Sequence, residues 1–527
     1  MRIIETVKKL TLTVILFFFI TDCAMGKDGD FEINDGTLIK YTGNLKHVDI
    51  PANLGIINIG WGAFFDCVNI TSVTIPDGVT SIGIAAFSGC TGLTSISIPN
   101  SVVNIGLSAF SDCSSLTTVT IPSSVENIDV LVFSNCTNLQ QIQVEENSQY
   151  YTSADGVLFN KNETELLCFP AGKTGSYSIP NSVTRIGHGA FMYCSKLISV
   201  TIPDSVTNLA NNAFLGCSGL ISITIPSSVT TITAAAFSGC TGLTSVYIPD
   251  SVTYIANTVF PNCISLQQIH VDQNNRNYTS IDGVLFNKNI TELLCFPAGK
   301  IGSYTIPDSV TKIGEWAFYT CTGLSSLNIP NSVREIGLRA FENCTGLTSI
   351  IIPNTVTDIG ALVFLRCTSL QQIQVEQNNQ YYTSIDGVLF NKNATELLCF
   401  PAGKTGSYVI PNSIIKINDS AFIDCKGLNS VAIPYSVNSI GNYAFQNCTS
   451  LISINIPNNV TIIRAMTFRD CISLKHVIIH DGITIIGDRA FFNCINLKQI
   501  IILQTNQDSD ISMLMDYLKE FELVFVK

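Results

Sequence analysis

The sequence predicts a mainly β solenoid, in which coils of 23 residues with short helical turns stack along one axis. A fixed period is the first observation, because fifteen of the nineteen cysteines recur at 23-residue steps within four blocks. The same phrase surrounds each of them, and the stretch from Cys90 to Cys113 is representative. A repeat of this length indicates equivalent coils that bury their apolar edges against one another. The periodic cysteines are Cys67, Cys90, Cys113, Cys136, Cys194, Cys217, Cys240, Cys263, Cys321, Cys344, Cys367, Cys425, Cys448, Cys471 and Cys494.

The first half of a coil is predicted to be a short parallel strand. In the stretch from Leu93 to Pro99, apolar residues alternate with serine and threonine, so Leu93, Ile96 and Ile98 point inward. Pro99 ends the strand because it has no N–H to donate to a β-ladder. A second short extended piece around Ile105 follows a polar turn.

The second half of a coil is expected to form a turn of helix or 3₁₀ structure. Gly106 breaks the extended piece, and the segment from Leu107 to Cys113 brings Ala109 and Phe110 inward with the cysteine. A phenylalanine recurs at this position in every coil. The stack is therefore expected to contain a phenylalanine spine.

Three insertions interrupt the period near residues 145–179, 272–306 and 376–410. Val-Leu-Phe and Leu-Leu-Cys-Phe flank a polar Asn-Lys-Asn turn in each of them, which predicts a β-hairpin. The solenoid is expected to span residues 67–502, after an N-terminal cap and first coil at 27–66. Residues 503–527 are expected to form a C-terminal cap with an amphipathic helix, because the last coil of a solenoid exposes its apolar edge.

Residues 1–26 are typical of a secretory signal peptide. Basic residues precede an apolar run from Leu10 to Ile20, and small residues suit cleavage before Lys27. Cleavage before Cys23, as in a lipoprotein, is the alternative. The protein is therefore expected to be secreted or to lie on the extracellular surface.

Composition narrows the classes of partner. Hydrophobic residues make up 46% of the 527 residues, charged residues only 13%, and the formal net charge is −12. The chain has no cluster of lysine and arginine after the signal, so nucleic acid is not an expected partner. No segment after the signal has the ~20 apolar residues of a membrane span.

The coil phrase Leu-x-x-Val-x-Ile-Pro-x-Ser-Val-x-x-Ile-Gly-x-x-Ala-Phe-x-x-Cys resembles the BspA-like (Treponema pallidum type) leucine-rich repeat. The resemblance covers residues ~31 to ~503 and includes the hairpins. It implies a right-handed leucine-rich repeat solenoid on a surface or secreted protein. It also implies adhesion to host proteins and cells, without enzymatic activity.

The cysteines allow three interpretations: disulfides, a metal framework or a buried thiol ladder. Metal sites need paired ligands such as Cys-x-x-Cys, which the chain lacks. Stacked cysteines come within disulfide range, but the geometry of in-register neighbours rarely suits the bond. Each one also lies among apolar residues, so we favour free thiols that pack as small hydrophobic side chains.

Three weaker motifs are interpreted as structural. His476 and His480 are four apart but lie on a strand, so they need not converge on a metal. The Gly-Lys-Thr-Gly sequences at Gly172 and Gly403 resemble part of a phosphate-binding loop, yet their context favours a turn after each hairpin. No catalytic residue, metal site or cofactor is predicted.

The candidate binding site is a ribbon of outward strand positions rich in hydroxyl and amide side chains. Its residues are Thr94, Ser95, Ser97, Thr117, Thr118, Thr120, Gln140, Gln141, Gln143, Gln267, Gln268, His270, Gln371, Gln372 and Gln374. A solvated strand face is the alternative, since serine and threonine suit exposed strands. The hairpin residues Asn162, Asn289 and Asn393 lie in Asn-x-Thr sequons and are candidate glycosylation sites.

The function that we infer is non-enzymatic binding or adhesion through this ribbon. The expected partners are extracellular or host/matrix proteins, with glycans as a further ligand class. The alternative is a structural protein of a surface coat or secreted matrix that has no specific ligand. An ice-binding surface is disfavoured because glutamine and isoleucine interrupt the threonine rows.

Overall fold

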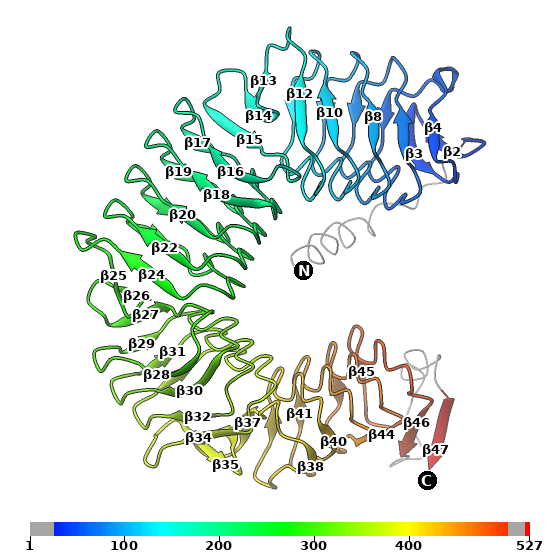
Figure 1. Cartoon of the computed structure of the whole chain (residues 1–527). Helices are drawn as coiled ribbons and strands as arrows, with labels where there is room; N and C mark the ends of the chain where they lie inside the picture. Colours follow the sequence, from blue (N-terminus) through cyan, green and yellow to red (C-terminus); the bar gives the residue numbers. More distant parts are fainter. Residues whose placement is uncertain (1–25, 504–521, 527) are drawn as a thin grey trace. The chain divides into compact units, whose positions relative to one another are not determined.

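The structure is a computed structural model that describes residues 26–503 and 522–526. It divides into two compact units, residues 1–155 and 156–527. Within each unit, the strands of successive coils lie side by side (Figure 1). The predicted mainly β solenoid of 23-residue coils with hairpin insertions is confirmed. Residues 1–25 of the expected signal peptide lie outside the described residues, as does most of the expected C-terminal helix.

The first side of each coil is the predicted strand. Alternation puts one set of side chains inside, so Val119 and Ile142 are buried while Thr118 and Gln141 beside them are exposed. In residues 26–155 these strands are β4 (His47–Asp49), β6 (Ser72–Thr74), β8 (Ser95–Ser97), β10 (Thr118–Ile121) and β12 (Gln141–Val144). In residues 156–527 they are β16 (Gly175–Ser178), β18 (Leu197–Thr201), β20 (Ser222–Thr224), β22 (Ser245–Ile248), β24 (Gln268–Val271), β28 (Gly302–Thr305), β30 (Leu324–Asn328), β32 (Ser349–Ile352), β34 (Gln372–Val375), β38 (Gly406–Val409), β40 (Leu428–Ala432), β42 (Ser453–Asn455), β44 (His476–His480), β46 (Gln499–Leu503) and β47 (Glu522–Val526).

The second side is a ladder of two-residue strands, each anchored by a buried or half-buried isoleucine or leucine. Its first series is β5 (Asn58–Ile59), β7 (Ser81–Ile82), β9 (Asn104–Ile105) and β11 (Asn127–Ile128). Its second series is β17 (Arg185–Ile186), β19 (Asn208–Leu209), β21 (Thr231–Ile232), β23 (Tyr254–Ile255), β29 (Lys312–Ile313), β31 (Glu335–Ile336), β33 (Asp358–Ile359), β39 (Lys416–Ile417), β41 (Ser439–Ile440), β43 (Ile462–Ile463) and β45 (Ile485–Ile486). Successive members pair in parallel, as Ile82 does with Ile105.

The third side differs from the expected helical turn. It consists of consecutive i→i+3 turns, such as those closed by Ser111 N–H to Ser108 O at 3.0 Å and Cys113 N–H to Phe110 O at 3.4 Å. Ser108 and Asp112 have φ of 54° and 61°, and alternate N–H groups of this segment, those of Ser108, Phe110 and Asp112, donate to the next coil. The Phe110 N–H, for example, donates to Val132 O at 2.9 Å. A helix would use these donors internally and leave adjacent coils unlinked, and the described residues contain one helix, the 3₁₀ helix η1 (Ala52–Leu54).

The core confirms the phenylalanine spine. Phe64, Phe87 and Phe110 are fully buried, and their ring centroids are stacked 4.7 and 5.3 Å apart. The same stacking continues at Phe214 and Phe237, 5.5 Å apart. Such stacks add to the free energy gained by burial.

The cysteines lie beside this spine. The eighteen described cysteines are free thiols, as the thiol-ladder hypothesis requires. Cys113 Sγ donates to the carbonyl oxygen of Phe87, one coil earlier, at 3.2 Å. Burial raises the pKa of Cys90 and Cys494 to about 12, so these thiols are protonated and inert.

The predicted hairpins are confirmed, and a third strand extends them. The hairpin strands are β13 (Tyr151–Ala154), β14 (Val157–Asn160) and β15 (Glu165–Cys168), then β25 (Tyr278–Ile281), β26 (Val284–Asn287) and β27 (Glu292–Cys295), then β35 (Tyr382–Ile385), β36 (Val388–Asn391) and β37 (Glu396–Cys399). In the second and third insertions all three strands are antiparallel, and the last pairs in parallel with the next coil. An N-terminal version is built from β1 (Gly26–Asp28), β2 (Phe31–Asn34) and β3 (Thr37–Tyr41).

Tyrosine hydroxyls complete the second-side ladder where a hairpin interrupts it. Tyr278 Oη accepts from the Ile255 N–H at 2.9 Å, and Tyr382 Oη accepts from the Ile359 N–H at 3.1 Å. The side chain thus supplies the acceptor that the next strand would otherwise provide. Within the part of the chain that the structure describes, no helix is long and apolar enough to cross a membrane.

Candidate protein-binding ribbon

The structure places all fifteen predicted ribbon residues on exposed positions of first-side strands or at the residue just before them. In residues 26–155 they lie in register. Ser95 and Ser97 pair with Ser72 and Thr74 of the preceding coil. On the next pair of strands, Thr118 pairs with Gln141 and Thr120 with Gln143. Adjacent side chains in such rows are about 4.8 Å apart.

The first glutamine group is linked by its own hydrogen bonds. Thr120 Oγ1 donates to Gln143 Oε1 at 3.4 Å, and Gln143 Nε2 donates to Gln141 Oε1 at 3.3 Å. These contacts hold the amides in a row along the surface. Because the amide dipoles are neutral, the row can donate and accept hydrogen bonds without a charge to desolvate.

The second and third glutamine groups belong to the other unit and lie in separate sheets. Gln268 and His270 on β24 pair with Ser245 and Tyr247 on β22. Gln372 and Gln374 on β34 pair with Ser349 and Ile351 on β32, and Gln374 Nε2 donates to Gln372 Oε1 at 3.0 Å. The structure therefore brings the members of each group together but keeps these two groups on different strands of the stack.

Sequence reasoning missed one residue of this surface. Tyr247 is 42% exposed, lies beside His270 and donates from Oη to Asp272 Oδ2 at 2.5 Å. This hydrogen bond to the carboxylate raises the pKa of Tyr247 and lowers that of Asp272. Its position in the repeat could have identified Tyr247 from the sequence, because it occupies the outward strand position that Ser97 and Thr120 hold in other coils.

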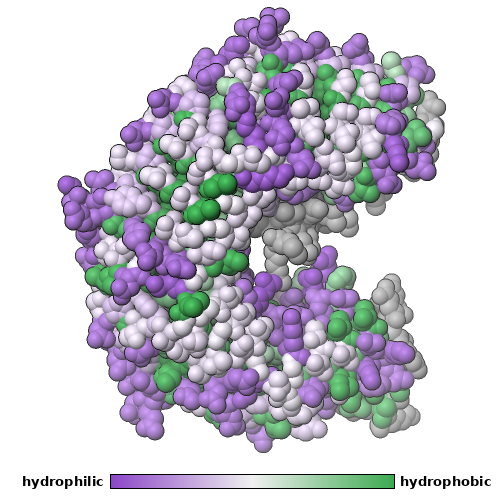
Figure 2. All heavy atoms as spheres, in the orientation of Figure 1, coloured by the Kyte–Doolittle hydropathy of each residue, from purple (hydrophilic) through white to green (hydrophobic). Residues whose placement is uncertain are grey.

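Exposed apolar side chains are scattered over the surface. Ile198 and Ile351 on first-side strands, and Ile221 and Ile452 just before such strands, are each about half exposed. On the face drawn in Figure 2, green apolar residues are separated by white and purple ones. The ribbon is thus mixed in polarity and dominated by uncharged groups.

The other candidate residues have structural surroundings. Asn162, Asn289 and Asn393 are exposed at the turns of the three hairpins. The threonine hydroxyl of the second sequon accepts from Asn287 Nδ2 at 2.8 Å, and Asn287 Oδ1 caps the turn by accepting from the Thr291 N–H. Glycosylation at these asparagines stays a prediction.

The two histidines do not converge. His476 is exposed, whereas His480 is buried with Nε2 2.9 Å from Val460 O and Nδ1 3.0 Å from the Gly482 N–H. Both ring nitrogens of His480 are therefore used by the backbone. No group of three His, Cys, Asp or Glu side chains that could hold a metal occurs among residues 26–503 and 522–526.

The Gly-Lys-Thr-Gly segments form turns, as their context predicted. The Gly403 N–H donates to Leu370 O at 2.8 Å, and the Lys404 N–H closes a turn onto Pro401 O at 3.1 Å. Lys404 Nζ donates to the carbonyl oxygen of Asp386 at 2.6 Å, so the ammonium group holds the hairpin.

A family model described as "BspA type Leucine rich repeat region (6 copies)" matches residues 57–160, 162–292, 288–405 and 397–514. The chain belongs to the BspA-type leucine-rich repeat family. The resemblance in the coil phrase is therefore confirmed. No curated protein sequence matches this BspA-type chain.

Solved structures of leucine-rich repeat proteins are similar to this BspA-type protein. A leucine-rich cell surface protein from Faecalibacterium prausnitzii is 24% identical over 96% of both chains, with a TM-score of 0.38. A leucine-rich repeat protein from Eubacterium ventriosum is 22% identical over 88% of this chain and 93% of its own, with a TM-score of 0.39. The pneumococcal vaccine antigen PcpA is 20% identical over 72% of this chain and 96% of its own, also with a TM-score of 0.39.

Proposed function

We propose that this protein is a non-enzymatic, exported binding protein that adheres to extracellular or host/matrix proteins through the ribbon. The observation that carries the proposal is the in-register display of uncharged hydroxyl and amide side chains on strands whose opposite faces are buried. A leucine-rich repeat solenoid is a scaffold that offers such extended surfaces. Family membership and the predicted signal peptide support an extracellular location.

The ribbon suits protein recognition for a physical reason. Its side chains stand on a backbone that hydrogen bonds to adjacent coils hold in place, so little backbone freedom is lost on binding. The fifteen residues include no Asp, Glu, Lys or Arg. Affinity should therefore come from hydrogen bonds and shape, with a weak dependence on ionic strength.

Direct binding of the secreted protein to a panel of purified matrix proteins tests the proposal. The test variant introduces four glutamates on the ribbon, at Thr117, Thr118, Gln140 and Gln141. The matched control introduces four glutamates at exposed positions off the ribbon, at Thr91, Asn100, Asn104 and Asn127. Both variants carry the same added charge.

We expect the affinity of the ribbon variant to fall at least about tenfold. The added glutamates would be buried at the interface without partners and would replace side chains that form hydrogen bonds, and each such change costs about 1–3 kcal/mol of binding free energy. The control should bind like the wild type. Equal binding by the two variants would place the site elsewhere. Binding to no panel member, with self-assembly in sedimentation, would favour the structural coat or matrix role.

A further inference from the structure

The hairpin insertions interrupt both strand ladders that join adjacent coils. At the third insertion, β34 and β38 on the first side belong to different sheets, as do β33 and β39 on the second side. The second insertion separates β24 from β28 and β23 from β29 in the same way. All these strands belong to the unit formed by residues 156–527.

Single hydrogen bonds take the place of the ladders, and they are alike at the two insertions. The Gly299 N–H donates to Leu266 O at 2.7 Å, and the Gly403 N–H donates to Leu370 O at 2.8 Å. The contacts of the third side must therefore account for any difference in how firmly the two insertions join their coils.

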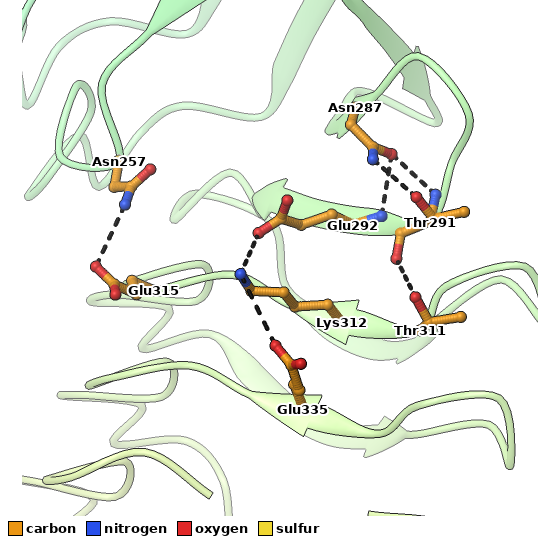
Figure 3. A network of polar contacts seen from close by, with 8 residues as sticks. All are labelled: Asn257, Asn287, Thr291, Glu292, Thr311, Lys312, Glu315 and Glu335. Atoms are coloured by element: carbon orange, nitrogen blue, oxygen red, sulfur yellow. Dashed lines mark hydrogen bonds and ion pairs between the residues drawn. The ribbon is translucent and has the colours of Figure 1, made fainter. Parts of the chain in front are cut away.

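Large side chains close the third side of the second insertion. Trp316 and Tyr319 meet edge to face with ring centroids 5.0 Å apart, and the Arg339 guanidinium lies 4.9 Å from the centroid of Trp316. Asn257 Nδ2 donates to Glu315 Oε2 at 3.3 Å, which joins the coils on either side of the hairpin (Figure 3). The structure shows two spaces of about 20 Å³ each at this place.

Smaller side chains leave a cavity of about 530 Å³ at the third insertion. Ser420 replaces the tryptophan, Ile423 the tyrosine and Ala361 the asparagine, and all three line the cavity. Asp419 stands at the glutamate position but accepts from the Asn442 N–H, in the coil that follows, at 2.7 Å. Side chains that do not touch gain no dispersion energy from one another, so packing on this side resists separation of the coils less than at the second insertion.

A buried polar atom in the cavity lining also lacks a hydrogen bond. Asn418 stands where the second insertion has Gly314, and its Oδ1 is buried without a donor among the described residues. A buried acceptor without a donor costs free energy that hydration would restore. Separating the coils at the cavity would let water reach this oxygen, so the cost weighs against the closed arrangement.

An ion pair spans the third side of the third insertion. Arg366 Nε lies 3.9 Å from Asp424 Oδ2, and the two residues immediately precede the cysteines of coils on opposite sides of the hairpin. Both side chains are partly buried. Neutral Asn262 and Thr320 hold the same positions at the second insertion. Attraction between opposite charges thus helps to hold the third insertion closed, and unlike packing it weakens as salt rises.

We propose that the third insertion is a bending joint within residues 156–527 and that the Arg366–Asp424 ion pair holds it closed. Breaking the pair opens the third side, and the hydrogen bonds kept on the other sides act as the pivot. Bending there changes the angle between β34, which carries Gln372 and Gln374, and β38, so the first-side surface beyond the third glutamine group shifts relative to that group. The joint does not require the ribbon to bind a partner.

Distances between pairs of spin labels in the full-length protein test the joint. Labels attached to genetically introduced p-acetylphenylalanine avoid the native thiols. One pair, at Thr322 and Ile472, spans the third insertion, and the matched pair, at Ser218 and Thr368, spans the second with equally many coils on each side. All four positions are exposed. We expect the distance distribution from double electron–electron resonance to be about twofold broader across the third insertion than across the second.

Salt and a single substitution test the ion pair. In about 1 M NaCl, where the Debye length is about 3 Å, the distribution across the third insertion should broaden further, while that across the second stays unchanged. Arg366→Met should broaden it at low salt and remove the response to salt. Arg334→Met, which changes an exposed arginine away from the joint, is the control and should change neither distribution. Equal widths across the two insertions, no response to salt, or no response to Arg366→Met would each overturn the proposal.

Grafting the contacts of the second insertion tests the packing. A variant that combines Ala361→Asn, Asp419→Glu, Ser420→Trp and Ile423→Tyr should narrow the distribution across the third insertion to that of the second. Circular dichroism and thermal unfolding check that each variant is folded, and the salt series on the wild type decides the question if one is not. A folded graft with the width of the wild type would contradict the proposed joint.

Discussion

The thiol of Cys217 donates a hydrogen bond to the carbonyl oxygen of Phe191, one coil earlier, at an Sγ–O distance of 2.9 Å. The same contact joins Cys240 to Phe214 at 3.2 Å and Cys263 to Phe237 at 3.0 Å. The cysteine of each coil thus satisfies a backbone acceptor beside the aromatic ring that it packs against. The Phe191 oxygen also accepts the Cys194 N–H of its own coil at 3.2 Å, so removing the cysteine of the next coil would leave a small void and take away the second of two donors.

Thiol counting tests the ladder directly. In denaturant without reductant, we expect the eighteen described cysteines to react with a thiol reagent because all are free. In the native protein at pH 8, the buried periodic cysteines, from Cys90 to Cys494, should react slowly, since burial keeps the reagent away from their sulfur atoms. A count near zero in denaturant would show disulfides instead.

Stability should fall as the pH rises above 9. The pKa of Cys90 is raised from 9.0 to about 12 in the folded protein, so the folded state keeps a proton that the unfolded state loses. This stabilisation is complete below pH 9 and declines between pH 9 and 12, by about 1.4 kcal/mol per such thiol at pH 10. Urea unfolding at several pH values measures the effect, and Cys90→Ser should show a shallower decline. A flat profile up to pH 11 would refute the assignment.

Truncating one ring of the spine should be costly. Phe237 is fully buried and stacks on Phe214 and Phe260 at centroid distances of 5.5 and 5.7 Å. We expect Phe237→Ala to lower the free energy of unfolding of its coils by about 3–5 kcal/mol. Phe492→Ala is the control, because that ring is 52% exposed and should cost less than about 1 kcal/mol. Similar costs for the two variants would contradict the spine.

Asn275 fixes the start of the second insertion. Its Nδ2 donates to Pro249 O and Val252 O at 2.8 and 3.0 Å, and its Oδ1 accepts from the N–H groups of Asn277 and Tyr278. Asn275→Leu leaves these buried groups unpaired and should cost about 3 kcal/mol or more in thermal or urea unfolding.

Asn275→Ser should be milder than Asn275→Leu, because Ser148 holds the matching position of the first insertion. There its Oγ accepts from the Tyr151 N–H at 3.3 Å. If the leucine variant were as stable as the serine variant, the hydrogen bonds of Asn275 would not be what holds this turn.

Ala235 lies in the left-handed region with φ of 55°, on the third side of its coil. Gly62 and Gly189 occupy the same position in other coils, with φ of 57° and 63°. Ala235→Gly should relieve strain and raise stability by up to about 1 kcal/mol. The neighbouring Ala236 is buried without a positive φ, so Ala236→Gly should destabilise by a similar amount. The two melting temperatures give the comparison, and a loss of stability in Ala235→Gly would contradict it.

Much of the fold could be predicted from one coil. The alternation around Ile96, the recurring phenylalanine and the cysteine period each describe which atoms a coil must bury. The third side could not be predicted in the same way. A helix and consecutive turns present similar residues inward, and the choice between them depends on donors such as the Phe110 N–H meeting an acceptor in the next coil.

The residues of the candidate binding surface also divide into those that the repeat pattern predicts and those that only contacts between coils reveal. The outward positions of Thr118 and Gln141 follow from a period of two, and the structure places both on the surface in register. Their role in binding stays a prediction. Tyr247 was missed because its partner Asp272 belongs to the following coil, and the sequence does not display that contact.

The sequence by itself determined the period, the buried positions and the places where hairpins enter, because these depend on residue types that repeat at fixed spacing. Only the tertiary structure decided how adjacent coils are joined and where space is left between them. At the third insertion, for example, a space of about 530 Å³ is lined by Ala361, Ser420 and Ile423, which come together only after the hairpin has folded between their coils. A volume bounded by distant side chains is a property of their packing, and no local pattern encodes it.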